Sequence, residues 1–222
     1  VARKEMVEGP VGYIEELTRV AVQCINEGDC RVRDEMLKTL NRWTQEMISN
    51  ANTHPQIAGT AIDLINKMSA ALTAVIWNTS NTTAWDLFYI YKNQFMALNV
   101  SGMTGWGEPP GNVMVVTRNG RKYVVIPGLM FGNVFIGPEP QRGWEADAAN
   151  LYHSTIVPPP HCYLAWYAWV NTVFGANAQI HVGRHATYEW TPRKQYALSS
   201  FDYPDICIGD TPSLYIYIMD GV

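Results

Sequence analysis

Residues 161–182 read HCYLAWYAWVNTVFGANAQIHV, and this stretch decides the predicted fold. Aromatic and apolar side chains fill residues 161–174, which predicts a helix, and Gly175 closes it as glycine commonly closes helices. The apolar run at residues 178–182 predicts a buried strand, and residues 133–136 predict another strand upstream of the helix. Strand, helix and strand in this order predict a βαβ unit. The fold class is therefore α/β, a βαβ-containing sheet with flanking helices.

The first hundred residues have the apolar spacing of helices instead. One predicted helix runs from about residue 11 to Gly28, and Asp29 is positioned to cap a second one. Thr53 and Pro55 resemble the first turn of a third helix, and a fourth is expected from Ala84. The buried stripe of the second helix is expected to be Val32, Met36, Leu40, Trp43 and Met47.

A Gly/Pro-rich connector begins at residue 101 and marks the predicted boundary. Beyond it, residues 113–117 and 122–127 flank an Asn119-Gly120 pair, which is a strong signal for a β-hairpin. We therefore predict a helical subdomain at 1–100 and an α/β region at 101–222. Both ends of the chain look cut, so we expect both parts to belong to a larger, truncated protein.

Composition restricts the classes of function. Hydrophobic residues make up 47% of the 222 residues and charged residues 16%, which is typical of a folded chain. The net charge of -4 argues against nucleic acid as the main partner, because binding phosphates requires a basic face. No apolar run reaches the roughly 18 residues that a membrane span requires. The four scattered cysteines fit reduced thiols of an intracellular protein, so a cytoplasmic location is expected.

The chemistry is concentrated just after the last predicted strand. His181, His185 and Glu189 follow one another at intervals of four residues, where a strand is expected to end and a helix to begin. In a helix, His185 and Glu189 would share one face, with Cβ atoms about 6 Å apart. Two imidazoles and a carboxylate can bind a divalent metal or transfer protons. A core histidine bonded to a structural carboxylate explains the same residues equally well, and the spacing matches no established metal motif.

A wider set of motifs resembles the cobaltochelatase and magnesium chelatase family, represented by CobN and the magnesium chelatase H subunit. The resemblance covers residues 127–219 most closely, and residues 1–100 show none. The matching runs are WGEPPGN (106–112), IPGLMFGNVFIGP (126–138), QRGWE (141–145), LYH (151–153), PPPH (158–161), IHVG (180–183), HATYE (185–189), Pro192 and IGD (208–210).

The resemblance implies a subunit that binds a tetrapyrrole and carries the site where a divalent metal enters the ring. The metal is cobalt or magnesium in the familiar members, and iron in a relative that acts on haem. Partner ATPase subunits of the AAA+ type use ATP to drive the step. His181, His185 and Glu189 become the expected catalytic and metal-binding residues. Residues expected to contact the ring or its carboxylates are Arg142, Trp144, Glu145, Tyr188, Trp190, Arg193 and Lys194.

Simpler explanations stay open for each of these ring contacts. The aromatic residues would serve equally well as core packing, and the cations as solvated surface charge. His153 and His161 also follow the family pattern, but they stand beside prolines in expected loops, where a structural role is favoured.

The chain departs from the family's His-Gly-Thr-x-Glu-x-x-Pro-Gly-Lys pattern at two positions. Ala186 and Arg193 each replace a glycine that could take a positive φ or let a ligand approach closely. The family's metal and ring pairing is therefore not expected to transfer directly. Insertion and removal of the metal are one reaction run in opposite directions, and both stay open. A non-catalytic tetrapyrrole carrier and a metal-dependent hydrolase are the alternative functions.

Overall fold

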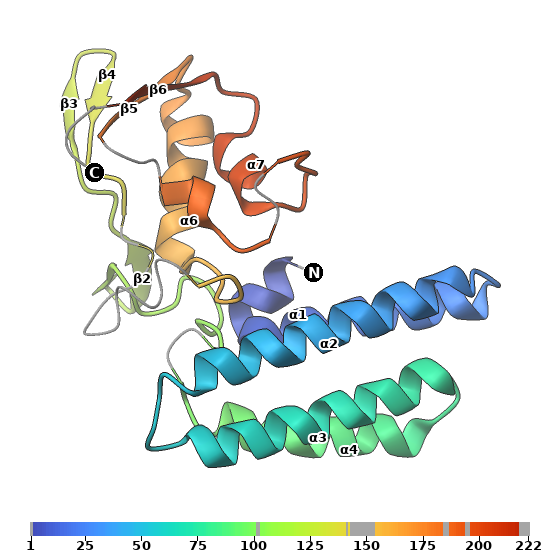
Figure 1. Cartoon of the computed structure of the whole chain (residues 1–222). Helices are drawn as coiled ribbons and strands as arrows, with labels where there is room; N and C mark the ends of the chain where they lie inside the picture. Colours follow the sequence, from blue (N-terminus) through green and yellow to red (C-terminus); the bar gives the residue numbers. More distant parts are fainter. Residues whose placement is uncertain are drawn as a thin grey trace. The chain divides into compact units, whose positions relative to one another are not determined.

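The protein is described by a computed structural model (Figure 1), which covers residues 2–100, 103–140, 142, 154–183, 187–193 and 196–217. The chain divides into two compact units. The first comprises Val1–Gly105 with Ile156–Pro158, and the second comprises Trp106–Thr155 with Pro159–Val222. Among the described residues, no helix is long and apolar enough to cross a membrane. The four cysteines are free thiols, as predicted.

The described residues of the first unit form four helices. They are α1 (Ala2–Asn26), α2 (Arg31–Ala51), α3 (Ala58–Trp77) and α4 (Thr82–Met96), and each packs against the next in the chain. The predicted apolar stripe of α2 is confirmed at Met36, Leu40, Trp43 and Met47, which are all buried, whereas Val32 remains half-buried. The side chain of Asn81 caps α4 by accepting a hydrogen bond from the Ala84 amide.

Two helix boundaries differ from the prediction. The first helix begins at Ala2 and continues past residue 11 through a kink at Gly9, where φ is 68°. A Cβ at Gly9 would lie 2.4 Å from the main-chain oxygen of Met103, so only glycine allows this close approach of two backbones. The third helix begins at Ala58, because the Thr53 hydroxyl bonds to the Asn50 carbonyl in the turn after α2 instead of capping a helix.

A buried carboxylate ties α1 to α4 inside the first unit. Glu15 accepts hydrogen bonds from Lys4 at 2.6 Å and from Lys92 at 2.6 Å, and Lys92 is itself buried. Burial alone would raise the pKa of Glu15, but the hydrogen bonds and positive charges of Lys4 and Lys92 outweigh it and lower this pKa to about 2. The pair is therefore ionised at neutral pH.

In its described part, the second unit contains three two-stranded sheets. Strands β1 (Val115–Arg118) and β2 (Arg121–Val124) form the predicted hairpin, with positive φ at both Asn119 and Gly120. Strands β3 (Leu129–Phe131) and β4 (Val134–Ile136) form a second hairpin. Strands β5 (Gln179–Gly183) and β6 (Ser213–Tyr217) pair in parallel, with His181 opposite Tyr215.

The aromatic helix is confirmed. It runs as α6 (His161–Ala168), widens into a π-helical turn at η1 (Trp169–Phe174) and ends at Gly175 with φ of 70°. Two short helices follow β5, the 3-10 helix η2 (Thr187–Trp190) and α7 (Tyr203–Ile208). The βαβ unit is β5, α7 and β6, which makes this region α/β as expected.

Two predictions about the strands were wrong. The strand at 134–136 pairs with β3 through a tight local turn, so it is not the partner of the strand after α6. The strand predicted as buried has one open face, since Ile180 is 58% exposed and Val182 71% exposed. Alternate residues of β5 point to opposite faces, and Gln179, His181 and Gly183 lie on the covered side.

Candidate functional site

His181 lies on the covered face of β5, where aromatic rings surround its imidazole. Its ring stacks on Tyr167 of α6 at a centroid distance of 6.3 Å and an interplanar angle of 26°. Tyr188 of η2 meets it edge-on at 5.3 Å, and Tyr215 of β6 lies 6.5 Å away. Three elements that are separate in sequence therefore enclose one imidazole.

The Nε2 nitrogen of the His181 imidazole is the next feature of the site. This atom is buried and has no hydrogen-bond partner within the part of the chain that the structure describes. Burial lowers the pKa of His181, and the negative charge of Glu139 opposes this shift only in part. The ring is therefore neutral at neutral pH, with a lone pair that can accept a proton or bind a metal.

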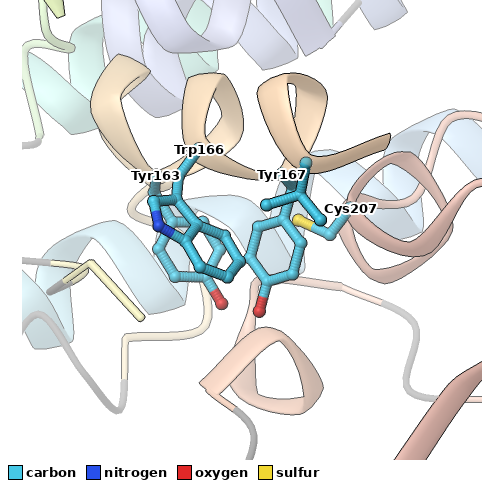
Figure 2. Close-up of a cluster of buried hydrophobic side chains, with 5 residues drawn as sticks. Tyr163, Trp166, Tyr167 and Cys207 are labelled. Atoms are coloured by element: carbon cyan, nitrogen blue, oxygen red, sulfur yellow. The ribbon is translucent and has the colours of Figure 1, made fainter. Parts of the chain in front are cut away.

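The carboxylate of Glu139, which no motif in the sequence indicates, is linked to this histidine through Tyr167. Glu139 accepts a hydrogen bond from the Tyr163 hydroxyl at 2.8 Å, and the Tyr167 hydroxyl donates to the same oxygen. Burial raises the pKa of Tyr167, and the charges of Tyr163 and Glu139 act in the same direction, so the phenol stays protonated and donates. Figure 2 shows both tyrosine hydroxyls on one side of α6, with Cys207 packed against Tyr167.

One signal in the sequence could have revealed this cluster. Tyr163 and Tyr167 are four residues apart and therefore share one face of the helix. Glu139 is 24 residues from one hydroxyl and 28 from the other, so no local pattern links it to them.

The residues of η2 and the residues that contact it differ in burial and in hydrogen bonding. Tyr188 is half-buried against the aromatic cluster, and its hydroxyl lies 3.2 Å from Ser213 Oγ. Arg142 is 1% exposed, and its guanidinium donates to the main-chain oxygen of Trp190. This geometry fits a residue that supports η2 better than a solvated surface charge. Trp190 itself is half-buried.

Arg193 occupies one of the positions where the family pattern has glycine. Its φ is 78°, in the left-handed region that favours glycine, so the residue is held in a conformation that costs about 1 kcal/mol or more. Its guanidinium lies 5.0 Å from the ring centroid of Tyr203, a cation–π contact that helps to hold this conformation.

Several predicted site residues lie outside the described residues. They are Trp144, Glu145, His153, His185, Ala186 and Lys194, and the side chain of Glu189 belongs with them. The structure describes only the backbone of Glu189, within η2. Over the described ranges, no group of three or more His, Cys, Asp or Glu side chains is placed to hold a metal ion. The ligand set at His181, His185 and Glu189 stays a prediction.

His161 has a structural position. It begins α6 and is not in a loop, and its Nε2 atom donates to the main-chain oxygen of Gly107 at 2.7 Å. A Cβ at Gly111 would lie 3.1 Å from the His161 ring. The WGEPPGN loop therefore packs against the start of α6, and this histidine holds the loop in place.

Comparison with known proteins places the chain in a family. Residues 55–222 match the family model described as CobN/Magnesium Chelatase. An uncharacterized protein of Methanocaldococcus jannaschii is 43% identical over 116 residues, 52% of this chain and 9% of that protein. The aerobic cobaltochelatase subunit CobN of Pseudomonas aeruginosa is 40% identical over 115 residues, with the same two shares. The chloroplastic magnesium-chelatase subunit ChlH of Oryza sativa subsp. indica is 39% identical over 112 residues, 50% of this chain and 8% of that protein.

This chain thus spans about a tenth of the length of the curated relatives that it matches. No solved structure matches it. The family match begins at residue 55, so it extends into the helical unit, where the sequence analysis found no resemblance. Since it covers well over half of the chain, this protein belongs to the CobN/magnesium chelatase family.

Proposed function

We propose that this chain is part of the large subunit of a tetrapyrrole metal chelatase. Such an enzyme exchanges a divalent metal for the pyrrole protons of the ring. Family membership supports this reaction class, since two of the named relatives are subunits of a cobaltochelatase and of a magnesium chelatase. The metal is a substrate here, and cobalt, magnesium and iron are the candidates. AAA+ partner subunits that use ATP belong to the same proposal.

His181, His185 and Glu189 are the proposed catalytic and metal-binding residues. The observation that carries this assignment is the buried Nε2 atom of His181, which lacks a hydrogen-bond partner among the described residues. Tyr188, the residue before Glu189, packs against the His181 ring at 5.3 Å. Helix η2, which contains Glu189, therefore packs against strand β5, which contains His181. This packing favours a site that Glu189 and His181 share.

The proposed reaction balances without a redox step. On insertion, two pyrrole N–H bonds break, the metal bonds to the ring nitrogens, and two protons leave as one divalent cation enters. Neutral imidazole can accept such a proton or hold the incoming metal, and a carboxylate can do either as well. Removal of a metal runs through the same groups in the opposite direction.

The remaining predicted residues would shape the ring site. Tyr188, Trp190 and Trp144 offer flat apolar contact, while Glu145 and Lys194 offer polar contact with ring substituents. We assign Arg142 to the support of η2, because it is buried and bonds to the Trp190 carbonyl. Arg193 is assigned to the wall of the site, next to η2.

The test is metal exchange by the full-length protein, followed through the visible absorbance of the tetrapyrrole. Free porphyrins with Co²⁺ or Mg²⁺ test insertion, in the presence of ATP and the partner subunits. Reduced haem tests removal. His181→Ala, His185→Ala and Glu189→Gln should each lower the rate by about 100-fold or more, the typical loss for a proton-transfer group. His54→Gln, in the helical unit, is the matched histidine control and should keep the wild-type rate.

Two outcomes would replace the proposal. If the wild-type protein binds tetrapyrroles without exchanging any metal, and the three variants bind equally well, the chain belongs to a carrier. If it holds zinc tightly and shows no affinity for tetrapyrroles, a metal-dependent hydrolase is the better explanation.

A further inference from the structure

We propose that Glu139 is a positioning residue that holds the His181 imidazole in place through the phenol ring of Tyr167. The proposal deepens the function above and rests on the role assigned there to His181. It concerns how the imidazole is oriented, and Glu139 is not expected to touch the substrate.

The first link joins the carboxylate to α6. Glu139 stands between Pro138 and Pro140, whose rings restrict the backbone on both sides. Tyr163 and Tyr167 are fully buried and one helical turn apart, and both hydroxyls donate to Oε1 of Glu139. Hydrogen bonds to a carboxylate are stronger than those between neutral groups, so this anchor fixes both phenols firmly.

The second link joins Tyr167 to the histidine. The Tyr167 ring lies nearly parallel to the imidazole, and Tyr188 stands edge-on to both rings. The imidazole is thus held in a corner between two phenols. The Nε2 atom of His181 forms no hydrogen bond with the described residues, so we assign the orientation of the imidazole to these ring contacts.

The two tyrosines differ in a way that makes the proposal testable. Tyr163 touches Tyr167 at a centroid distance of 5.3 Å, but the described ring contacts of His181 involve only Tyr167, Tyr188 and Tyr215. If Glu139 only stabilised the fold, losing either hydroxyl should have a similar effect. If it positions the histidine, the loss of the Tyr167 hydroxyl should matter far more.

The experiment measures how fast diethyl pyrocarbonate modifies each histidine of the full-length protein, with peptide mapping by mass spectrometry. Glu139→Ala and Tyr167→Phe should each speed modification of His181 about five-fold, because each breaks the hydrogen bond that anchors the Tyr167 ring. Tyr163→Phe should change the rate by less than about two-fold, because the Tyr167 anchor remains. Glu139→Gln keeps an acceptor oxygen and should recover part of the protection.

His161 is the internal reference, because it lies in the same unit with its ring bonded to Gly107. A parallel rise at His161 would mean that the unit has loosened as a whole, which would overturn the proposal. Equal effects of Tyr163→Phe and Tyr167→Phe, or an unchanged His181 rate in Glu139→Ala, would overturn it as well. The double variant Glu139→Ala/Tyr167→Phe should modify His181 at the same rate as either single variant, because both substitutions break the same hydrogen bond.

Metal exchange separates this proposal from the function on which it rests. If Glu139→Ala exposes His181 but His181→Ala leaves metal exchange intact, the positioning holds and the proposed function fails. If His181→Ala abolishes exchange while Glu139→Ala changes neither the protection of His181 nor kcat, the function stands and the positioning role is wrong.

Discussion

The phenol ring of Tyr188 meets the imidazole of His181 edge-on, with centroids 5.3 Å apart and ring planes at 73°. Tyr188 is next to Glu189 in η2, whereas His181 lies in β5. This contact connects the helix that carries the proposed acid to the strand that carries the proposed base. The geometry of the site should therefore depend on Tyr188 even though its phenol is assigned no chemical step.

Shortening Tyr188 should accordingly affect both stability and activity. Tyr188→Ala removes the contacts with His181 and Tyr167, and we expect a loss of about 2–3 kcal/mol in the free energy of unfolding. Metal exchange should fall about tenfold as the imidazole loses one wall. Tyr188→Phe keeps the ring and gives up only the contact with Ser213, so it should cost about 1 kcal/mol or less and keep near-wild-type exchange. Denaturant unfolding and the exchange assay measure both effects, and equal activity of the two variants would contradict this role.

Acid should destabilise the helical unit through Glu15. The pKa of this carboxyl is about 2 in the folded unit, against 4.5 for an ordinary glutamate, so its contribution to stability is fully present only well above pH 4.5. As the pH falls from about 5 towards 2, that contribution, on the order of 2–3 kcal/mol, should be lost. Unfolding followed by circular dichroism at several pH values checks this dependence.

Two variants isolate the contribution of Glu15. Glu15→Gln should lower stability at pH 7 by about 3 kcal/mol, because it removes a carboxylate partner from the buried Lys92, and it should flatten the acid response. Glu35→Gln removes an exposed pair with Lys38 and should change stability by less than about 0.5 kcal/mol. If the stability of Glu15→Gln still fell with acid as much as that of the wild type, other groups would be responsible for the pH dependence.

The kink in α1 should tolerate no side chain. In Gly9→Ala, the new methyl would lie 2.4 Å from the Met103 oxygen and 2.6 Å from the Gly105 amide nitrogen, so we expect a loss of more than about 4 kcal/mol. Gly28→Ala is the matched control. It has a positive φ of 103° but no atom within 4 Å, so only backbone strain of about 1–2 kcal/mol is expected. Similar losses in the two variants would mean that the close approach at Gly9 relaxes easily.

The strained backbone at Arg193 predicts an unusual ranking of substitutions. Arg193→Ala loses the contact with Tyr203 and keeps the positive φ, while Arg193→Gly loses the same contact but removes the strain. The glycine variant should therefore be more stable than the alanine variant by about 1 kcal/mol. Thermal unfolding of both proteins checks the order, and a more stable alanine variant would show that this φ is not strained in solution.

The sequence predicted those parts of the fold that depend on local chemistry. The hairpin around Asn119 and Gly120 and the end of the aromatic helix at Gly175 follow from residues that favour positive φ. The start of α1 was not predictable, because a Gly-Pro pair usually ends a helix and here a contact with Gly105 holds the chain through the kink. The choice of partner for β5 also depends on contacts distant in sequence.

The candidate site was predictable in part for the same reason. The spacing of two histidines and a glutamate at intervals of four residues indicated His181 as a candidate site residue. In the structure, its imidazole contacts the rings of Tyr167 and Tyr188. Glu139 was not predictable, because its partners, Tyr163 and Tyr167, lie on another element far along the chain. The motif thus led to the proposed base, whereas the proposed positioning residue became visible only in the fold.

The most direct test is to locate a metal bound to the protein. Crystals of the protein grown with Co²⁺ should give an anomalous difference peak within about 2.3 Å of His181 Nε2, with His185 and Glu189 as further ligands. A peak bound elsewhere, or a structure in which these three side chains point away from one another, would contradict the central claim.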